Sequence, residues 1–245
     1  MTKNGFTLVE LSIVIVIIGL IVAGVVGGQT LVKQAKIKAQ VTDLSKYDLA
    51  YNAFKLEYDA IPGDFIDAPS HWPGVPAGDG DGRITHDPDA PHDITRENIK
   101  FFQHLSEAEL IQGDYSNVWE RDVGYPSLKI NPNKGMVAGG NIRSAGGPGN
   151  HQVTSEDSLK PYTAVLFMNE GQNTVGSTHN SLPTGHARTY RLIDQKMDDG
   201  IARQGRFMAY RFYEPGFGNC LTSIGGDYDL TNPDEACMGM YIIEK

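Results

Sequence analysis

The chain lacks features that several common functional classes need. It has only two cysteines among 245 residues, and its formal net charge of −9 argues against the basic face that nucleic-acid binding requires. The spacings His-Glu-x-x-His, Gly-x-Ser-x-Gly and Cys-x-x-Cys do not occur in it. The glycine-rich stretch 139–149 lacks the Gly-Lys-Ser/Thr ending of a phosphate-binding loop. We therefore expect neither an enzyme active site nor a nucleic-acid partner.

The composition is that of a folded, loop-rich protein. Hydrophobic residues make up 40% of the chain, which is too many for a disordered one. The 28 glycines and 13 prolines predict many loops around a modest framework. A chain of this length can bury one good core or two small ones.

The longest apolar run lies at the start of the chain. It extends from Leu11 to Val26, and a single carboxylate, Glu10, lies at its mouth. An ionised side chain in hydrocarbon is costly, so such residues usually have a charged or polar partner. Cleavage after Gly5 would create one, because the new amino group on Phe6 would be a cation next to the Glu10 of a neighbouring chain.

This N-terminal stretch resembles the prepilin leader of type IV pilins and type II secretion pseudopilins. The resemblance rests on residues 5–10 and on the apolar residues 11–19 that follow them, which read Gly-Phe-Thr-Leu-Val-Glu and Leu-Ser-Ile-Val-Ile-Val-Ile-Ile-Gly. It is dense over about the first 40 residues and weak beyond them. It implies cleavage after Gly5 by a prepilin peptidase, methylation of Phe6, and a role for Glu10 in the register of subunits entering a filament.

Two other interpretations of the N-terminus compete with this one. A secretory signal peptide has a shorter apolar core, and an acid at Glu10 would be a needless cost in it. A plain single-pass anchor needs about 20 apolar residues, which this segment also supplies. Either membrane interpretation places Lys3 on the cytoplasmic side.

A second half of the same helix is expected beyond the apolar run. Gly27 and Gly28 predict a bend or an easily melted joint, because glycine is a poor helix former. Relatives often carry a proline near this point, and this chain does not. An amphipathic stripe then follows at helical spacing, and its members are Ile37, Val41, Leu44, Tyr47, Tyr51, Phe54 and Tyr58. Pro62 should end the helix.

The expected organisation is α+β. A leader (1–5), a membrane or filament-core helix (6–28) and its amphipathic continuation (29–61) precede a globular head (62–245), in which an antiparallel sheet should pack against the long helix as in the pilin roll. The elements expected in the head are helices over 93–102, 106–113 and 183–200, a sheet that begins near Trp119, Tyr125 and Leu128, a loop over 131–149, and strands over 162–168, 205–213 and 238–243.

An acidic loop follows the long helix. Its residues 78–84 have the Asp-x-Asp-Gly-x-Ile spacing of the middle of a calcium loop, with Asp79 and Asp81 as candidate ligands. The full pattern fails at both ends, where Ala77 and Pro88 replace ligands. Asp87 and Asp89 are the candidate substitutes, and some pseudopilins bind calcium in a loop of the head. A calcium site and a solvated acidic turn both remain open.

Cys220 and Cys237 lie close together near the C-terminus. A head carried out of the cytoplasm meets an oxidising compartment, so we expect a disulfide rather than two buried thiols. The loop of 18 residues from Cys220 to Cys237 predicts a stabilisation of about 3 kcal/mol.

These features predict a structural subunit of a type IV pilus or pseudopilus. We expect an inner-membrane precursor, surrounded by lipid, with a periplasmic head. Its expected partners are the prepilin peptidase, other pilin or pseudopilin subunits and the inner-membrane assembly platform. The large head favours a minor or specialised pilin. The rival hypothesis is a membrane-anchored periplasmic binding protein that does not polymerise.

Overall fold

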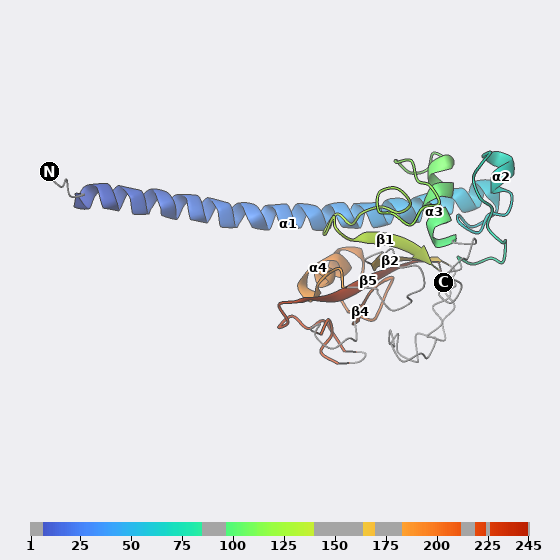
Figure 1. Cartoon of the computed structure of the whole chain (residues 1–245). Helices are drawn as coiled ribbons and strands as arrows, with labels where there is room; N and C mark the ends of the chain where they lie inside the picture. Colours follow the sequence, from blue (N-terminus) through green and yellow to red (C-terminus); the bar gives the residue numbers. More distant parts are fainter. Residues whose placement is uncertain are drawn as a thin grey trace.

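A long helix projects from a head in the computed structural model (Figure 1). The structure describes residues 7–84, 97–139, 164–169, 183–211, 219–223 and 226–244. Helix α1 (Leu8–Tyr58) has 51 residues and is therefore about 77 Å long at the rise of an α-helix. Its first part extends away from the head, and its later part runs along it.

The two halves of α1 differ in what they contact. From Leu8 to Val26 every large apolar side chain is at least 48% exposed, and Ile37 is the first fully buried one. The predicted amphipathic stripe is confirmed, because its members from Ile37 to Tyr58 are buried or partly buried against the head. The helix ends at Tyr58, where Asp59 adopts a left-handed conformation (φ 49°), three residues before Pro62.

The bend expected at Gly27 and Gly28 is absent, since α1 passes through both glycines as regular α-helix. A Cβ atom at either position would have no neighbour within 4 Å. Nothing in the isolated chain therefore requires glycine there, and neither a proline nor an inserted side chain is present to kink the helix.

The head contains an antiparallel sheet centred on strand β5 (Glu235–Glu244). This strand pairs with β2 (Ala164–Asn169), β3 (Gly185–His186) and β4 (Phe207–Arg211), and β1 (Gly135–Gly139) pairs with the other side of β2. The strands predicted over 162–168, 205–213 and 238–243 thus correspond to β2, β4 and β5. The sheet and the long helix confirm the predicted α+β fold.

Three shorter helices complete the described part of the head. Helix α4 (Ala187–Met197) packs against α1, β4 and β5, whereas α3 (Glu97–Glu107) packs against β1 and α1. The short α2 (Ala68–His71) follows the end of α1. Aromatic rings join α3 to α1, because the ring centroid of Phe102 lies 5.4 Å from that of Tyr47.

Polar contacts also fix α1 to the sheet. The guanidinium group of Arg206 donates to both carboxylate oxygens of Asp48 at 3.0 Å, and the Tyr241 hydroxyl donates to the same carboxylate at 3.0 Å. About two helical turns further on, Lys55 forms an ion pair with Glu244 at 2.6 Å. The helix and the sheet therefore form one continuous body.

The predicted helix over 106–113 is wrong. Ser106 lies in the last turn of α3, and Glu109 follows it in a left-handed conformation (φ 57°). The Glu109 N–H donates to the Ser106 carbonyl and the Leu110 N–H to the Leu105 carbonyl, which is the Schellman arrangement that ends a helix. The spacing of Ser106 and Glu109 therefore marks a helix end and not a start.

The predicted start of the sheet is also wrong. Trp119, Tyr125 and Leu128 lie outside the named strands, and β1 falls inside the stretch 131–149 that was expected to be a loop. Tyr125 is buried, and a Cβ atom at Gly135 would lie 2.3 Å from its ring. Glycine in β1 thus makes room for an aromatic ring from another segment.

Helix α4 begins later than predicted. Thr184 donates its N–H to the Cys237 carbonyl, and residues 185–186 form β3, so the helix starts at Ala187 and not at Pro183. Pairing with β5 therefore takes precedence over helix formation at these positions.

Candidate functional site

The first candidate site is the N-terminus of α1. Thr7 is the N-cap residue, and its N–H and its hydroxyl both donate to Glu10 Oε2 at 2.8 and 2.9 Å. The Glu10 N–H donates in return to the Thr7 hydroxyl oxygen at 3.3 Å. These contacts form a capping box, which satisfies N–H groups that the first turn of a helix leaves unpaired.

The capping box gives Glu10 a role that the sequence interpretation missed. Its signal was present, because a threonine three residues before a glutamate at the start of an apolar run is the usual pattern. Both hydrogen bonds from Thr7 end on Oε2, and Oε1 of Glu10 accepts no hydrogen bond from the residues that the structure describes. One carboxylate oxygen thus remains available to a donor from outside. Gly5 and Phe6 lie outside the described residues.

The helix that follows this site is suited to a membrane. Among the described residues, α1 alone is long and apolar enough to span a bilayer, with a mean hydropathy of 2.9 over its most apolar 18 residues. The 19 residues from Leu8 to Val26 measure about 29 Å, which matches the hydrocarbon thickness of about 30 Å. None of this window is buried against the head.

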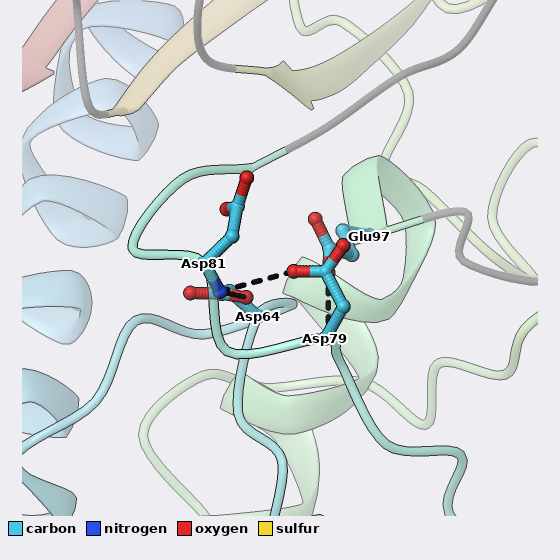
Figure 2. A group of neighbouring side chains, drawn as sticks. All are labelled: Asp64, Asp79, Asp81 and Glu97. Atoms are coloured by element: carbon cyan, nitrogen blue, oxygen red, sulfur yellow. Dashed lines mark hydrogen bonds between the residues drawn. The ribbon is translucent and has the colours of Figure 1, made fainter.

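The second candidate site is the acidic loop beyond the end of α1. Figure 2 shows that its four carboxylates come from three segments: Asp64 just after α1, Asp79 and Asp81 from one turn, and Glu97 from the start of α3. One carboxylate oxygen from each residue lies within 4.8 Å of the others. Asp64 and Glu97 are buried, whereas Asp79 and Asp81 are exposed.

Backbone N–H groups hold this loop around the Asp64 carboxylate. Oδ1 of Asp64 accepts from the N–H groups of Gly80 (2.6 Å) and Asp81 (3.1 Å), and Oδ2 accepts from the N–H of Gly82 (2.8 Å). The Asp79 N–H donates to Glu97 at 2.9 Å. Gly80 and Gly82 have φ angles of 76° and 81°, which allow the turn to fold over a side chain at low cost.

Burial raises the pKa of Asp64 to about 6, and the nearby Glu97 and Asp81 add to this shift, although hydrogen bonds from Gly82 and Gly80 oppose it. Helix α3 supports the loop from the other side, because the Lys100 ammonium donates to the Ala77 carbonyl at 2.6 Å. Such a cluster of carboxylate oxygens is the ligand type that calcium prefers.

The structure brings together only part of the predicted ligand set. Asp79 and Asp81 lie in the cluster, whereas Asp87 and Asp89 lie outside the described residues. The sequence interpretation missed Asp64 and Glu97. Asp64 lies two residues after Pro62 and outside the 78–84 spacing, and no local pattern connects Glu97 to a loop that ends 13 residues earlier.

The two cysteines form the predicted disulfide. Cys220 and Cys237 are bonded, and both are fully buried. The bond ties the segment around residue 220 to β5, next to the point where Thr184 and β3 pair with the same strand. His186 lines a groove beside α1, and His86, His92 and His179 lie outside the described residues.

Comparison with known proteins identifies only the N-terminal segment. Residues 1–26 match the prokaryotic N-terminal methylation motif, the prepilin-type cleavage and methylation segment of type IV pilins and pseudopilins. No curated protein and no solved structure matches the chain significantly. The resemblance seen in the sequence is therefore confirmed for this segment.

Proposed function

We propose, with the prepilin-type methylation segment as the premise, that the chain is a subunit of a type IV pilus or pseudopilus. In this proposal a prepilin peptidase cleaves after Gly5 and methylates Phe6, and the subunit then assembles through α1. The match of residues 1–26 carries the proposal. The exposed apolar half of α1 supports it, because that surface suits lipid before assembly and neighbouring helices afterwards.

Glu10 is the residue on which assembly depends in this proposal. Its Oε2 caps its own helix, while Oε1 is left for the amino group of a neighbour's processed Phe6. Pairing of these two charges relieves the cost of keeping a carboxylate in an apolar environment. The pairing also sets the axial position of one subunit against the next.

The test of processing is the mass of the N-terminal peptide from protein made in its native host. A chain that begins at N-methylated Phe6 supports the proposal. A chain that still begins at Met1 refutes it and favours the anchored binding protein, which does not polymerise and does not depend on Glu10.

The role of Glu10 is tested by three variants that separate charge from helix capping. Glu10→Gln keeps an oxygen that accepts from Thr7 but removes the charge, whereas Glu10→Ala removes both. Thr7→Val keeps the charge and weakens the cap by about 1 kcal/mol. We expect all three to enter the membrane, and only the two Glu10 variants to lose filament yield. Normal filaments from Glu10→Gln would refute the charge pairing and leave capping as the role of Glu10.

The proposed location is the bacterial inner membrane, with Lys3 in the cytoplasm and the head in the periplasm, where the assembly platform collects the subunit into a filament. The buried disulfide supports an oxidising compartment for the head. Cysteine labelling by a membrane-impermeant reagent, at a new exposed cysteine in the head, tests this orientation in intact spheroplasts. Labelling only after the membrane is opened would contradict it.

We further propose a minor or specialised pilin rather than the major subunit. The head spans residues 62–245, a large volume to repeat along a thin filament. The abundance of the chain in sheared filaments decides between these roles. A chain that dominates the sheared fraction would be the major pilin.

A calcium ion at the acidic loop is a separate proposal, supported by the convergence of Asp64, Asp79, Asp81 and Glu97. Calcium at 100 times its Kd would raise the free energy of unfolding by about 2.7 kcal/mol. The measurement compares the thermal unfolding of the full chain in detergent with calcium and with a chelator. The Asp79→Asn/Asp81→Asn variant should lose the shift, and Asp114→Asn, in an exposed loop elsewhere, should keep it. An unchanged Tm of the wild type in millimolar calcium would refute the site.

A further inference from the structure

A groove lies where the head first meets α1, just beyond the apolar segment. The groove has a volume of about 590 Å³. One wall is α1, from Gln29 to Ile37, and the opposite walls are the loop around Pro132 and the start of α4. The groove therefore lies between the helix that enters the membrane and the part of the head that packs against it.

The height of this groove corresponds to the headgroup layer of a bilayer. The apolar segment that ends at Val26 is about as long as the hydrocarbon core is thick. Lys33 and Lys36 follow it by seven and ten residues, which is about 10 to 15 Å along the helix. Headgroup layers add about 5 to 8 Å on each side of the hydrocarbon, and lysine side chains reach several ångströms back toward them.

Two lysines in the groove give it the positive charge that an anionic headgroup needs. Lys33 and Lys36 are exposed, and neither forms an ion pair within the described part of the chain. Two of the other lysines on α1 do have such partners, since Lys46 pairs with Asp43 and Lys55 with Glu244. Glu235, the acid that lines the groove, accepts a hydrogen bond from the neutral amide of Asn131, and the two lysines outnumber it.

Apolar side chains complete the groove beside these cations. Val32, Ile130 and Pro132 line it together with the buried Ile37. Val32 is 57% exposed and continues the apolar surface of the membrane segment up to the two lysines. A ligand with a negative group and attached hydrocarbon chains would match both parts of this lining.

We propose that this groove binds the headgroup of an anionic phospholipid, with the phosphate between Lys33 and Lys36 and the acyl chains running along α1 past Val32. The proposal rests on the membrane-anchored state of the proposed function, and it needs neither processing at Gly5 nor polymerisation. The bound lipid holds the head at a defined angle to the membrane before assembly. Each lysine near an anionic surface contributes a factor on the order of five in affinity.

The test measures which lipid remains on the full chain after reconstitution in nanodiscs of equal parts phosphatidylglycerol and phosphatidylcholine. Native mass spectrometry of the released protein gives the ratio of the two lipids bound. We expect the wild type to retain phosphatidylglycerol at least several-fold over its share of the mixture. Lys33→Gln/Lys36→Gln should bring this ratio close to that of the mixture.

Lys38→Gln is the matched control, because Lys38 is exposed on the same stretch of α1 but does not line the groove. It should retain the preference of the wild type. An unchanged preference in the double variant, or an equal loss in Lys38→Gln, would overturn the proposal in favour of a diffuse attraction of the whole segment. A groove occupied by a second copy of the chain would appear as dimers without bound lipid, and that result would also overturn it.

This outcome is independent of processing. A chain that keeps Met1 in its native host would refute the filament subunit and leave the lipid preference intact. A chain that is processed and polymerises but shows no preference for phosphatidylglycerol would refute the lipid site alone. Failure of the chain to enter nanodiscs would refute both.

Discussion

Replacement of Asp194 by asparagine is expected to change how the stability of the head depends on pH. Asp194 lies in α4 and is fully buried. Its Oδ2 accepts from the Tyr228 hydroxyl at 2.8 Å, and its Oδ1 accepts from the Gly200 N–H at 3.1 Å. The side chain thus joins the end of α4 to the segment that follows Cys220.

Burial raises the pKa of Asp194 to about 6, although the hydrogen bonds from Tyr228 and Gly200 oppose the shift. In the unfolded chain an aspartate has a pKa of about 3.9. A raised pKa in the folded state means that the contribution of this group to stability is fully present below about pH 3.9 and is lost as the pH rises through about 6. A difference of about two pKa units corresponds to about 3 kcal/mol.

The asparagine side chain of the variant would resemble the protonated carboxyl, because its amide can donate to the Tyr228 oxygen while its carbonyl accepts from Gly200. The free energy of unfolding of Asp194→Asn minus that of the wild type should therefore be about 3 kcal/mol larger at pH 7.5 than at pH 4. For a head of this size, the Tm of the variant minus the Tm of the wild type should be about 6 to 12 °C larger at pH 7.5 than at pH 4. The assay is thermal unfolding of both full chains in detergent across this pH range.

Other carboxylates do not disturb this comparison. Asp64 also has a raised pKa, but because it is present in both proteins, its effect on the pH dependence of stability cancels. Asp229 has a lowered pKa because its carboxylate accepts hydrogen bonds from Thr231. Its contribution to stability is present above about pH 3.9 and is lost only below that value, so Asp229→Asn should leave the difference between pH 4 and pH 7.5 nearly unchanged and serves as the control. A difference between wild type and Asp194→Asn that is equal at pH 4 and pH 7.5 would refute the reasoning.

Three further predictions concern the frame that carries these sites. Cys220→Ser/Cys237→Ser should lower the free energy of unfolding by about 3 kcal/mol, because the disulfide is lost. Urea titration of the oxidised wild type and of the variant measures this difference. Equal midpoints would contradict a stabilising disulfide. Gly239→Ala should destabilise the head by about 1 to 3 kcal/mol, because the added Cβ would lie 2.3 Å from Met168 and from the ring of Tyr190; a Tm equal to that of the wild type would show that the ring has room to move. Gly28→Ala should raise helix content in detergent, because alanine is the better helix former. It should leave the Tm of the head unchanged, since the added methyl has no neighbour within 4 Å. Circular dichroism measures both quantities, and a lower Tm would mean that this position does contact the head.

Much of the long helix could be predicted because its information is local. The apolar run, the helical spacing of the stripe from Ile37 to Tyr58 and the acid at Glu10 all lie within one continuous segment. The capping box of Thr7 and Glu10 was equally local and could have been recognised. The strands β2, β4 and β5 were predictable for the same reason, since composition and alternation mark them without reference to their neighbours.

The errors occurred where distant segments decide the structure. Residues 135–139 form a strand because β2 offers hydrogen bonds there, and β3 replaces the first turn of a predicted helix because β5 does the same. Ser106 and Glu109 have the spacing of a helix start, but the core packing of α3 extends the preceding helix to Glu107. In each case tertiary contacts outweighed a local preference of about 1 kcal/mol.

By itself the sequence determined the membrane helix, the processing segment and the disulfide pair, because apolar length, a short motif and a count of two cysteines need no partner in space. Only the tertiary structure decided that Asp64 and Glu97 join Asp79 and Asp81, and that Lys33 and Lys36 face a groove formed with the start of α4. Both sites are built from segments far apart along the chain. Their geometry depends on the folding of the head against α1, which no local pattern encodes.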